Sequence, residues 1–183
     1  MLVLWIILAV VVLLILIAIF YFNRFVVLSN RIDNSLSQID VQLKRRADLI
    51  PNLIETVKGY AKHEKSIMED VSKARKAMMA AKDIVGKVKA NDVLSGALGR
   101  LFAVAENYPD LKASSNFIEL QRELSSTEDR VAYARQNYND SILSYNNIIQ
   151  KFPGAMFAGM YGRKAKQYLQ IAEVEKKAPK VSF

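Results

Sequence analysis

The residues that most often do catalytic or metal chemistry are scarce in this chain. It has no cysteine and one histidine, His63. A ferritin-like metal site needs Glu-x-x-His spacings on two helices, but Tyr60 stands three residues before His63. A Ser-His or Cys-His nucleophile pair would have to use the same single imidazole, and neither Gly-x-Gly-x-x-Gly nor Gly-Lys-Ser/Thr occurs. We interpret His63, beside Glu64, as a capping or solvent-exposed residue, and expect no enzyme, no cofactor and no metal.

Two groups of polar residues admit two interpretations. One is a structural network between two helices, and the other is a surface for docking a partner. Charged groups inside a bundle must be paired, because an isolated one costs several kcal/mol, and guanidinium groups suit carboxylate partners. The sequence therefore favours the structural network. Its predicted members are Arg45, Arg46, Asp48 and Asn52 on one helix, with Glu128, Arg130, Arg135 and Asn139 on the other.

An apolar segment, FPGAMFAGMY at residues 152–161, precedes a run of basic residues. If the helix before it returns to a membrane, this segment lies among the headgroups and the basic residues meet anionic lipid, each worth about 1 kcal/mol. The alternative is a solvated surface and tail, as for the basic stretch between Lys73 and Lys89. The predicted lipid-contacting residues are Met156, Phe157, Met160, Tyr161, Arg163, Lys164 and Lys166, and the tail adds Lys176, Lys177 and Lys180.

Nucleic acid is not an expected partner. The lysines are accompanied by no helix-turn-helix, zinc-finger or aromatic RNA-stacking motif. The net charge of +8 therefore favours an anionic membrane surface over a nucleic acid.

The first 22 residues contain no charged side chain. As a helix they would be about 33 Å long, enough to cross a hydrocarbon core of about 30 Å. A cleaved signal peptide would need a basic start, a shorter apolar core and a small-residue cleavage site. The sequence lacks these features, and Trp5 and Tyr21 are placed like the aromatic residues at the two headgroup regions. We therefore predict an uncleaved transmembrane anchor.

The charges that flank the anchor predict its orientation. Arg24, Arg31 and the basic residues at 44–46 follow the apolar run, and no basic side chain precedes it. By the positive-inside rule, the amino terminus lies outside the cell membrane and the rest of the chain is cytoplasmic. The absence of cysteine fits a reducing compartment.

Helical spacing of apolar residues continues after the anchor. Between Leu28 and Ala61 the steps are three or four residues, with an eleven-residue repeat that is close to an undistorted helix. This predicts a helix over 24–61 that continues from the anchor, with a kink at Pro51. A second helix is predicted around 67–85, and a third from Leu94 to Tyr108, where Pro109 stops it. The residues 86–91 are predicted to connect these two helices.

The fourth predicted helix runs from Ser115, its proposed cap, to Phe152, where Pro153 and Gly154 end it. Short connections make neighbouring helices antiparallel. We predict that residues of the first and fourth helices lie level when their numbers sum to about 177. The expected division is an anchor at 1–22, an all-α bundle of about four long helices at 23–152, and an interfacial or basic tail at 153–183.

Several motifs lie in the same order as in a known family. In the first half they are RIDN at 31–34, SQIDVQLKRRADLIPNL at 37–53 and VKGYAKHE at 57–64. In the second half they are YP at 108–109, LKA at 111–113, TE at 127–128, AYAR at 132–135, YN at 138–139 and 145–146, and FP at 152–153. The chain resembles the LemA family over nearly its whole length after the anchor. The resemblance implies a bacterial single-pass membrane protein with a bundle of long helices and no established enzymatic activity.

The functional prediction is a non-enzymatic helical scaffold anchored in the membrane, which acts through protein or lipid contacts as a homo-oligomer. The Ala-rich segment Lys73–Lys82 is one candidate for packing between subunits, or alternatively within one bundle. Two other functions remain open. One is a membrane-shaping or lipid-organising protein that contacts membrane lipids, and the other is an accessory subunit whose partner is a membrane enzyme.

Overall fold

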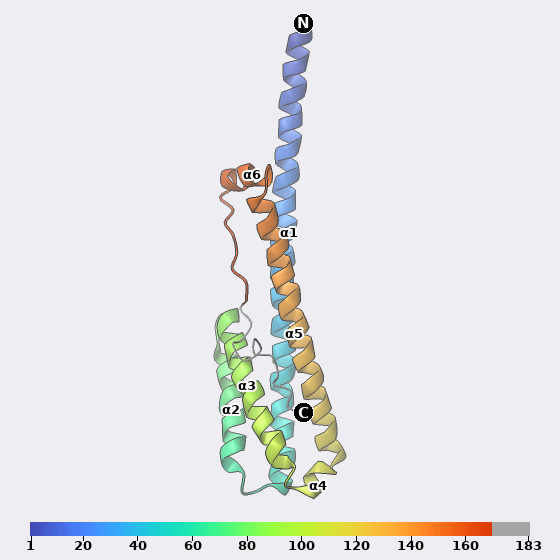
Figure 1. Ribbon diagram of the computed structural model, residues 1–183, viewed down its shortest axis with the longest axis vertical. Coiled ribbons are helices and arrows are strands. Elements are labelled where there is room, and N and C mark those ends of the chain that lie inside the picture. The colour runs from blue at the N-terminus through green and yellow to red at the C-terminus, as the bar shows by residue number, and fades with distance from the viewer. Residues whose placement is uncertain (170–183) are drawn as a thin grey trace, which may run out of the picture. The chain divides into compact units, whose positions relative to one another are not determined.

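The computed structural model describes residues 1–169, which form six α-helices (Figure 1). No strand occurs among these residues, so the predicted all-α fold is confirmed. The tail residues Lys176, Lys177 and Lys180 lie outside the described part of the chain, and the predicted domain division stays a prediction. The helices are α1 Leu2–Tyr60, α2 Lys65–Ala80, α3 Ile84–Ala105, α4 Pro109–Lys112, α5 Ser115–Gln150 and α6 Gly154–Met160.

Helix α1 is unbroken over 59 residues, from the apolar stretch through Pro51 to Tyr60. The eleven-residue repeat explains its length after the stretch, because Leu28, Ile39, Ile50 and Ala61 are all buried. The ring of Pro51 is exposed, and Ile50 beside it is fully buried. Packing of the helix on both sides of Pro51 therefore outweighs the one backbone hydrogen bond that proline removes. The predicted continuation of the helix from the apolar stretch is confirmed.

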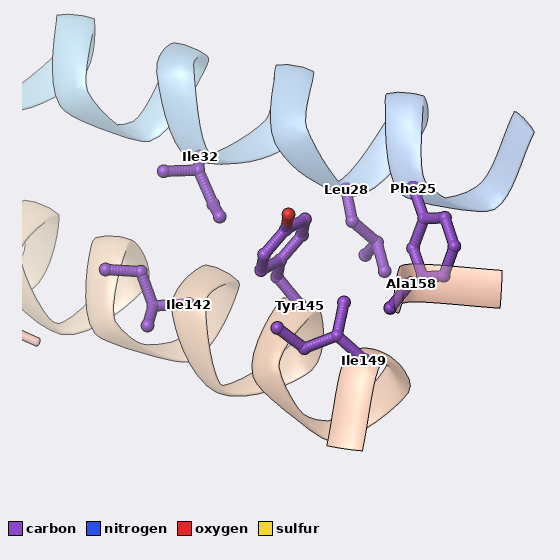
Figure 2. Close-up of a cluster of buried hydrophobic side chains, with 7 residues drawn as sticks. All are labelled: Phe25, Leu28, Ile32, Ile142, Tyr145, Ile149 and Ala158. Atoms are coloured by element: carbon purple, nitrogen blue, oxygen red, sulfur yellow. The ribbon is translucent and has the colours of Figure 1, made fainter. Parts of the chain in front are cut away.

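The chain divides into two compact units, and α1 and α5 each contribute to both. The first unit comprises Met1–Ser37 and Arg135–Tyr168. Its core joins Phe25, Leu28 and Ile32 of α1 to residues of α5 and α6, and Figure 2 shows the Tyr145 ring between the two long helices. The remaining core residues are Ile142, Tyr145 and Ile149 of α5 and Ala158 of α6.

The predicted antiparallel register can be checked inside the first unit. The hydroxyl oxygens of Ser35 and Ser141 lie 3.1 Å apart, and both residues are buried. Their numbers add to one less than the predicted sum. The helices α1 and α5 are therefore neighbours at the expected level in this unit.

The second unit comprises Gln38–Ala134 and Leu169, and its core draws on α1, α2, α3, α4 and α5. The predicted connection at 86–91 is wrong, because α3 already begins at Ile84. The turn consists of 81–83, and the Asp83 carboxylate accepts a hydrogen bond of 2.7 Å from the backbone amide of Gly86. This N-cap satisfies an amide that has no partner inside the helix, which explains why the helix starts so early.

Two predicted boundaries shift by a few residues. Helix α3 ends at Ala105 before Tyr108, and Pro109 begins the short helix α4. Proline fits a first helical turn because its missing amide would have no partner there. Helix α5 covers most of the predicted 115–152 segment, with Ser115 as its first residue instead of its cap. The apolar segment that follows, predicted to lie among the lipid headgroups, contains the helix α6.

Candidate functional site

The first candidate site is the contact between α6 and the end of the apolar stretch of α1. The ring of Phe157 stacks on that of Tyr21, with centroids 5.1 Å apart and planes 10° from parallel. The hydroxyl of Tyr161 donates a hydrogen bond of 3.1 Å to the backbone carbonyl of Ala18. The same ring meets Phe22 and Phe25 edge-on, with centroid distances of 5.4 and 6.3 Å. These contacts fix α6 beside residues 18–25.

Close backbone approach places α6 there. Gly154 is buried, and a Cβ at this position would collide with the backbone carbonyl of Ile148 and lie 3.2 Å from the Tyr21 ring. At the other end, Gly162 has a φ of 63°, and the amide of Arg163 donates to the carbonyl of Ala158 at 2.8 Å. This is the hydrogen-bonding pattern of a Schellman motif, in which glycine adopts the left-handed conformation that ends the helix.

The opposite side of this segment is exposed and apolar. Phe152, Met156 and Met160 are 83%, 65% and 66% exposed. Met156 and Met160 are four residues apart and lie along one side of α6, and Phe152 lies in the turn just before the helix. We call these three residues the exposed face of α6. Lys151 and Lys164 are exposed at its two ends. The face therefore combines large apolar side chains with flanking positive charge.

The structure divides the predicted lipid-contacting residues into two groups. Met156, Met160 and Lys164 are exposed, whereas Phe157 and Tyr161 are partly buried against α1. Lys166 is half-buried with its amine 5.6 Å from the centroid of the Tyr145 ring, and its backbone exchanges two hydrogen bonds of 2.9 Å with the Asn146 side chain. Arg163 is half-buried. The exposed residues are therefore available for contact with lipid, whereas the partly buried residues Phe157, Tyr161, Arg163 and Lys166 hold the segment in place.

A buried polar cluster in the second unit is the other candidate. The Arg46 side chain donates to Asn91 Oδ1 at 2.6 Å and to Ser95 Oγ at 3.0 Å, and it forms an ion pair with Glu128. The Ser95 hydroxyl donates to Glu128 Oε1 at 3.0 Å. Burial lowers the pKa of Arg46 to about 10, and the charge of Asp92 opposes this shift. Arg46 as a whole is 3% exposed, so the cluster is closed to solvent on the Arg46 side.

Other members of the predicted network lie elsewhere. Arg45 pairs with Glu123 at 3.0 Å on the surface, and Asp48 pairs with Lys44 of its own helix at 3.1 Å. Two residues correspond to about 200° around a helix, so an inward Arg46 requires an outward Asp48. The placement of Asp48 in an interhelical network is therefore corrected. The exposed residues Asn52 and Arg130 belong to the second unit, whereas the buried Arg135 and half-buried Asn139 belong to the first.

The sequence did not point to Asn91 and Ser95 as cluster members. Asn91 is 1% exposed and lies on the buried side of α3, within the segment that had been assigned to a connection. One feature of the sequence could have predicted it. Val88, Asn91, Leu94 and Leu98 are three or four residues apart, which is the spacing of one buried helix face if Asn91 is counted as buried.

His63 is exposed and lines an open groove of about 720 Å³ with Lys58, Lys62 and Lys65, over the apolar Ile54 and Met68. The adjacent Glu64 accepts a hydrogen bond of 3.0 Å from the hydroxyl of Tyr108, which raises the pKa of that tyrosine. Within residues 1–169 there is no group of three or more His, Cys, Asp or Glu side chains placed to hold a metal ion.

These features define a class of protein, an all-α bundle whose longest helix carries one segment long and apolar enough to cross a membrane. The model of the LemA family matches residues 35–183, and the chain belongs to this family. Membership together with the apolar helix indicates a membrane-anchored protein.

Three relatives illustrate the similarity. A magnetosome protein MamQ of Paramagnetospirillum magneticum is 29% identical, with 81% of this chain and 64% of the relative covered. The magnetosome protein MamQ of Magnetospirillum gryphiswaldense is 28% identical over 80% of this chain and 64% of its own length. Protein LemA of Metamycoplasma hominis is 29% identical, covering 74% of this chain and 65% of that protein. The chain thus spans somewhat less than two thirds of these relatives.

Proposed function

We propose that this protein is a non-enzymatic, membrane-anchored helical scaffold that forms a homo-oligomer on the cytoplasmic side. The observation that carries the proposal is the continuity of α1, which runs from the apolar stretch to Tyr60 without a break. A continuous helix joins the apolar stretch to the packed residues of the bundle without an intervening loop. Such an element suits a protein that holds partners at a membrane surface.

The polar groups of the bundle support interaction over catalysis. The charged cluster around Arg46 is occupied by its own members, Asn91, Ser95 and Glu128. A buried guanidinium with this set of acceptors has the arrangement of a structural ion pair, which fixes one packing of three helices. The imidazole of His63 lies at the surface, in a groove that is also lined by three lysines, Glu69 and Ser72. An exposed imidazole among flexible surface side chains is not held in the fixed geometry that a general base requires.

Self-association is supported by large apolar side chains exposed in the second unit. Val41 of α1 is 62% exposed and Tyr133 of α5 is 72% exposed. Arg46 of α1 forms an ion pair with Glu128 of α5. Val41 lies five residues before Arg46, and Tyr133 lies five residues after Glu128. Because the two helices are antiparallel, Val41 and Tyr133 lie at the same level of the bundle. Aromatic side chains such as that of Tyr133 are enriched at protein interfaces. We call this pair the Val41–Tyr133 surface.

The Ala-rich segment Lys73–Lys82 offers a second face. Ala74 and Met78 are buried within the unit, whereas Ala77 and Ala80 are exposed. The buried residues serve packing within one bundle, and the exposed small residues allow another helix to approach closely. We assign the main subunit contact to the Val41–Tyr133 surface because it exposes more apolar area per side chain.

Because the chain contains no cysteine, a thiol reagent modifies only a cysteine that is introduced by substitution. We expect Tyr133→Cys in native membranes to give bands at multiples of the 20.7 kDa chain mass when treated with a short bismaleimide. The control Glu69→Cys, at an exposed position of α2, should remain monomeric. Cross-links solely to other proteins would support the accessory-subunit alternative and contradict the scaffold.

A membrane-impermeant maleimide should label Tyr133→Cys only after the cells are lysed, and labelling of intact cells would contradict the proposed orientation.

A further inference from the structure

We propose that the exposed face of α6 binds the headgroup region of an anionic bilayer and acts as a second membrane contact beside the anchor. This inference rests on the proposed function, because it requires the apolar stretch of α1 to cross the membrane. It assigns a ligand, an anionic phospholipid surface, to a part of the chain that the fold alone does not explain. Three observations from the first unit carry it.

The first observation is the level of α6 relative to the end of the apolar stretch of α1. The Tyr161 hydroxyl is bonded to the carbonyl of Ala18, which lies four residues before Phe22, the end of the uncharged run. Four residues correspond to about 6 Å along a helix. Amphipathic helices at membrane surfaces bury their apolar side about 5–10 Å into the boundary between headgroups and acyl chains. The contact with α1 therefore holds α6 at the depth of an interfacial helix.

The second observation is the chemistry of the exposed face. Phe152, Met156 and Met160 direct large apolar side chains away from the core, and each is at least 65% exposed. Transfer of such side chains from water into an apolar medium is favourable. The side of the segment that carries Phe157 and Tyr161 already packs on α1. The outer side is the one left for lipid.

The third observation is charge. No Asp or Glu occurs between Ser141 and Leu169, and none occurs before Asp33. The basic residues in these two stretches are Arg24, Arg31, Lys151, Arg163, Lys164 and Lys166. A region with only positive side chains beside an apolar face matches an anionic lipid surface. An ordinary solvated surface would mix both signs, as α2 does with Lys65, Glu69 and Asp70.

The alternative occupant of the exposed face is a second copy of this chain. Two such faces packed together would bring Lys151 and Lys164 of each copy close to those of the other. Like charges at that distance repel, which disfavours this contact. The charge pattern therefore favours lipid, and the experiment below separates the two.

The test uses the full chain reconstituted in liposomes of phosphatidylglycerol and phosphatidylcholine. Single-cysteine variants Met156→Cys and Met160→Cys carry an environment-sensitive fluorophore, and the lipids carry a quencher either near the headgroup or deep in the acyl chain. We expect at least a twofold loss of fluorescence with the shallow quencher. The control Asn30→Cys is exposed on α1, eight residues or about 12 Å beyond Phe22, and should lose much less.

A variant inside the apolar stretch distinguishes failure of this inference from failure of the anchor. Ile15→Cys should be quenched by the deep quencher whether or not α6 touches lipid. Quenching at position 15 without quenching at 156 and 160 overturns the second contact and leaves the anchor intact. Cross-linking of Met156→Cys between two copies, in place of quenching, also overturns it in favour of a dimer contact. Absence of quenching at all three positions overturns the anchor itself.

The charge component has its own readout. In phosphatidylcholine alone, or in phosphatidylglycerol with the double change Lys151→Gln and Lys164→Gln, quenching at position 156 should weaken. Each basic residue near an anionic surface is worth about 1 kcal/mol, or roughly a fivefold change in the balance between bound and free α6. Equal quenching in both lipids and in the double variant would overturn the anionic preference.

Discussion

Arg45 and Arg46 are neighbours in the sequence, but their guanidinium groups lie in different environments. Arg46 is 3% exposed and makes contacts with three side chains, whereas the side chains of Arg45 and its partner Glu123 are each nearly half exposed. A surface ion pair contributes about 0–1 kcal/mol, whereas removing one member of a buried pair leaves its partners without compensation. The two positions therefore form a matched comparison.

We predict that Arg46→Met lowers the free energy of unfolding by about 2–4 kcal/mol, because Asn91 and Glu128 lose their buried partner. Arg45→Met removes the same charge and should cost less than about 1 kcal/mol. Denaturant unfolding of the two variants in detergent, followed by circular dichroism, measures both values. Equal losses would contradict the assignment of Arg46 to a closed structural cluster.

At this scale the sequence predicted part of the cluster. The helical spacing and the register placed Arg46 near Glu128, and the structure joins them. Asp48 was placed in the same network, but it points outward because two residues rotate a helix by about 200°. The sequence could not identify Asn91 and Ser95 as members of the cluster. Asparagine is common in loops, and only tertiary packing shows that Asn91 is buried in a helix.

The predicted ends of the helices agree with the structure for the long helices and fail for α3. The apolar spacing predicted α1 and α5 nearly to their observed ends, because long periodic segments override local breakers such as Pro51. The spacing failed at the start of α3, where a single side-chain cap decides the boundary. Gly86 lies in the segment that was predicted to be a connection, and it is part of the helix in the structure.

We predict that Asp83→Ala destabilises the protein by about 0.5–2 kcal/mol, the usual cost of losing an N-cap acceptor. The variant Asp83→Asn keeps an acceptor oxygen and should lose only a small part of this amount. Thermal unfolding of both variants provides the measurement. If Asp83→Ala and Asp83→Asn behaved alike, the cap would not be what begins α3.

Two glycines of the α6 region offer a paired test. We predict that Gly154→Ala lowers stability by about 1–3 kcal/mol, because its Cβ would collide with the Ile148 carbonyl and force a backbone shift. At Gly159, inside α6, a Cβ meets nothing within 4 Å. Gly159→Ala should therefore raise stability by about 0.4–1 kcal/mol. Thermal unfolding followed by circular dichroism gives both values, and a stability loss at Gly159 with none at Gly154 would contradict the packing of α6 on α1.

The protein combines one long helix with two kinds of exposed apolar surface. The exposed face of α6 is assigned to lipid, and the Val41–Tyr133 surface is assigned to other subunits. The family and the all-α fold could be predicted from sequence motifs and helical periodicity. Assembly could not, because nothing in a single chain's periodicity separates a solvated exposed residue from one that contacts another copy.

We predict that the double change Val41→Glu and Tyr133→Glu converts the oligomer to a monomer in detergent, because like charges would face each other across the subunit contact. Both residues are exposed, so the unfolding temperature should change little. Light scattering coupled to size-exclusion chromatography measures the mass of the protein. The matched control Lys58→Glu with Arg122→Glu also introduces two acidic residues at exposed positions of α1 and α5, but about 25 and 16 Å along the helices from Val41 and Tyr133, and it should leave the oligomer intact. An unchanged oligomer in the double variant would contradict the proposed contact.

Both proposals require that the apolar stretch of α1 remains in the membrane as part of the mature protein. The most direct measurement is the intact mass of the protein recovered from membranes washed at alkaline pH, with its amino-terminal sequence read from the same sample. We expect the protein to stay in the membrane pellet and to retain the segment that ends at Phe22. A protein released into the supernatant, or one whose sequence starts after Phe22, would contradict it.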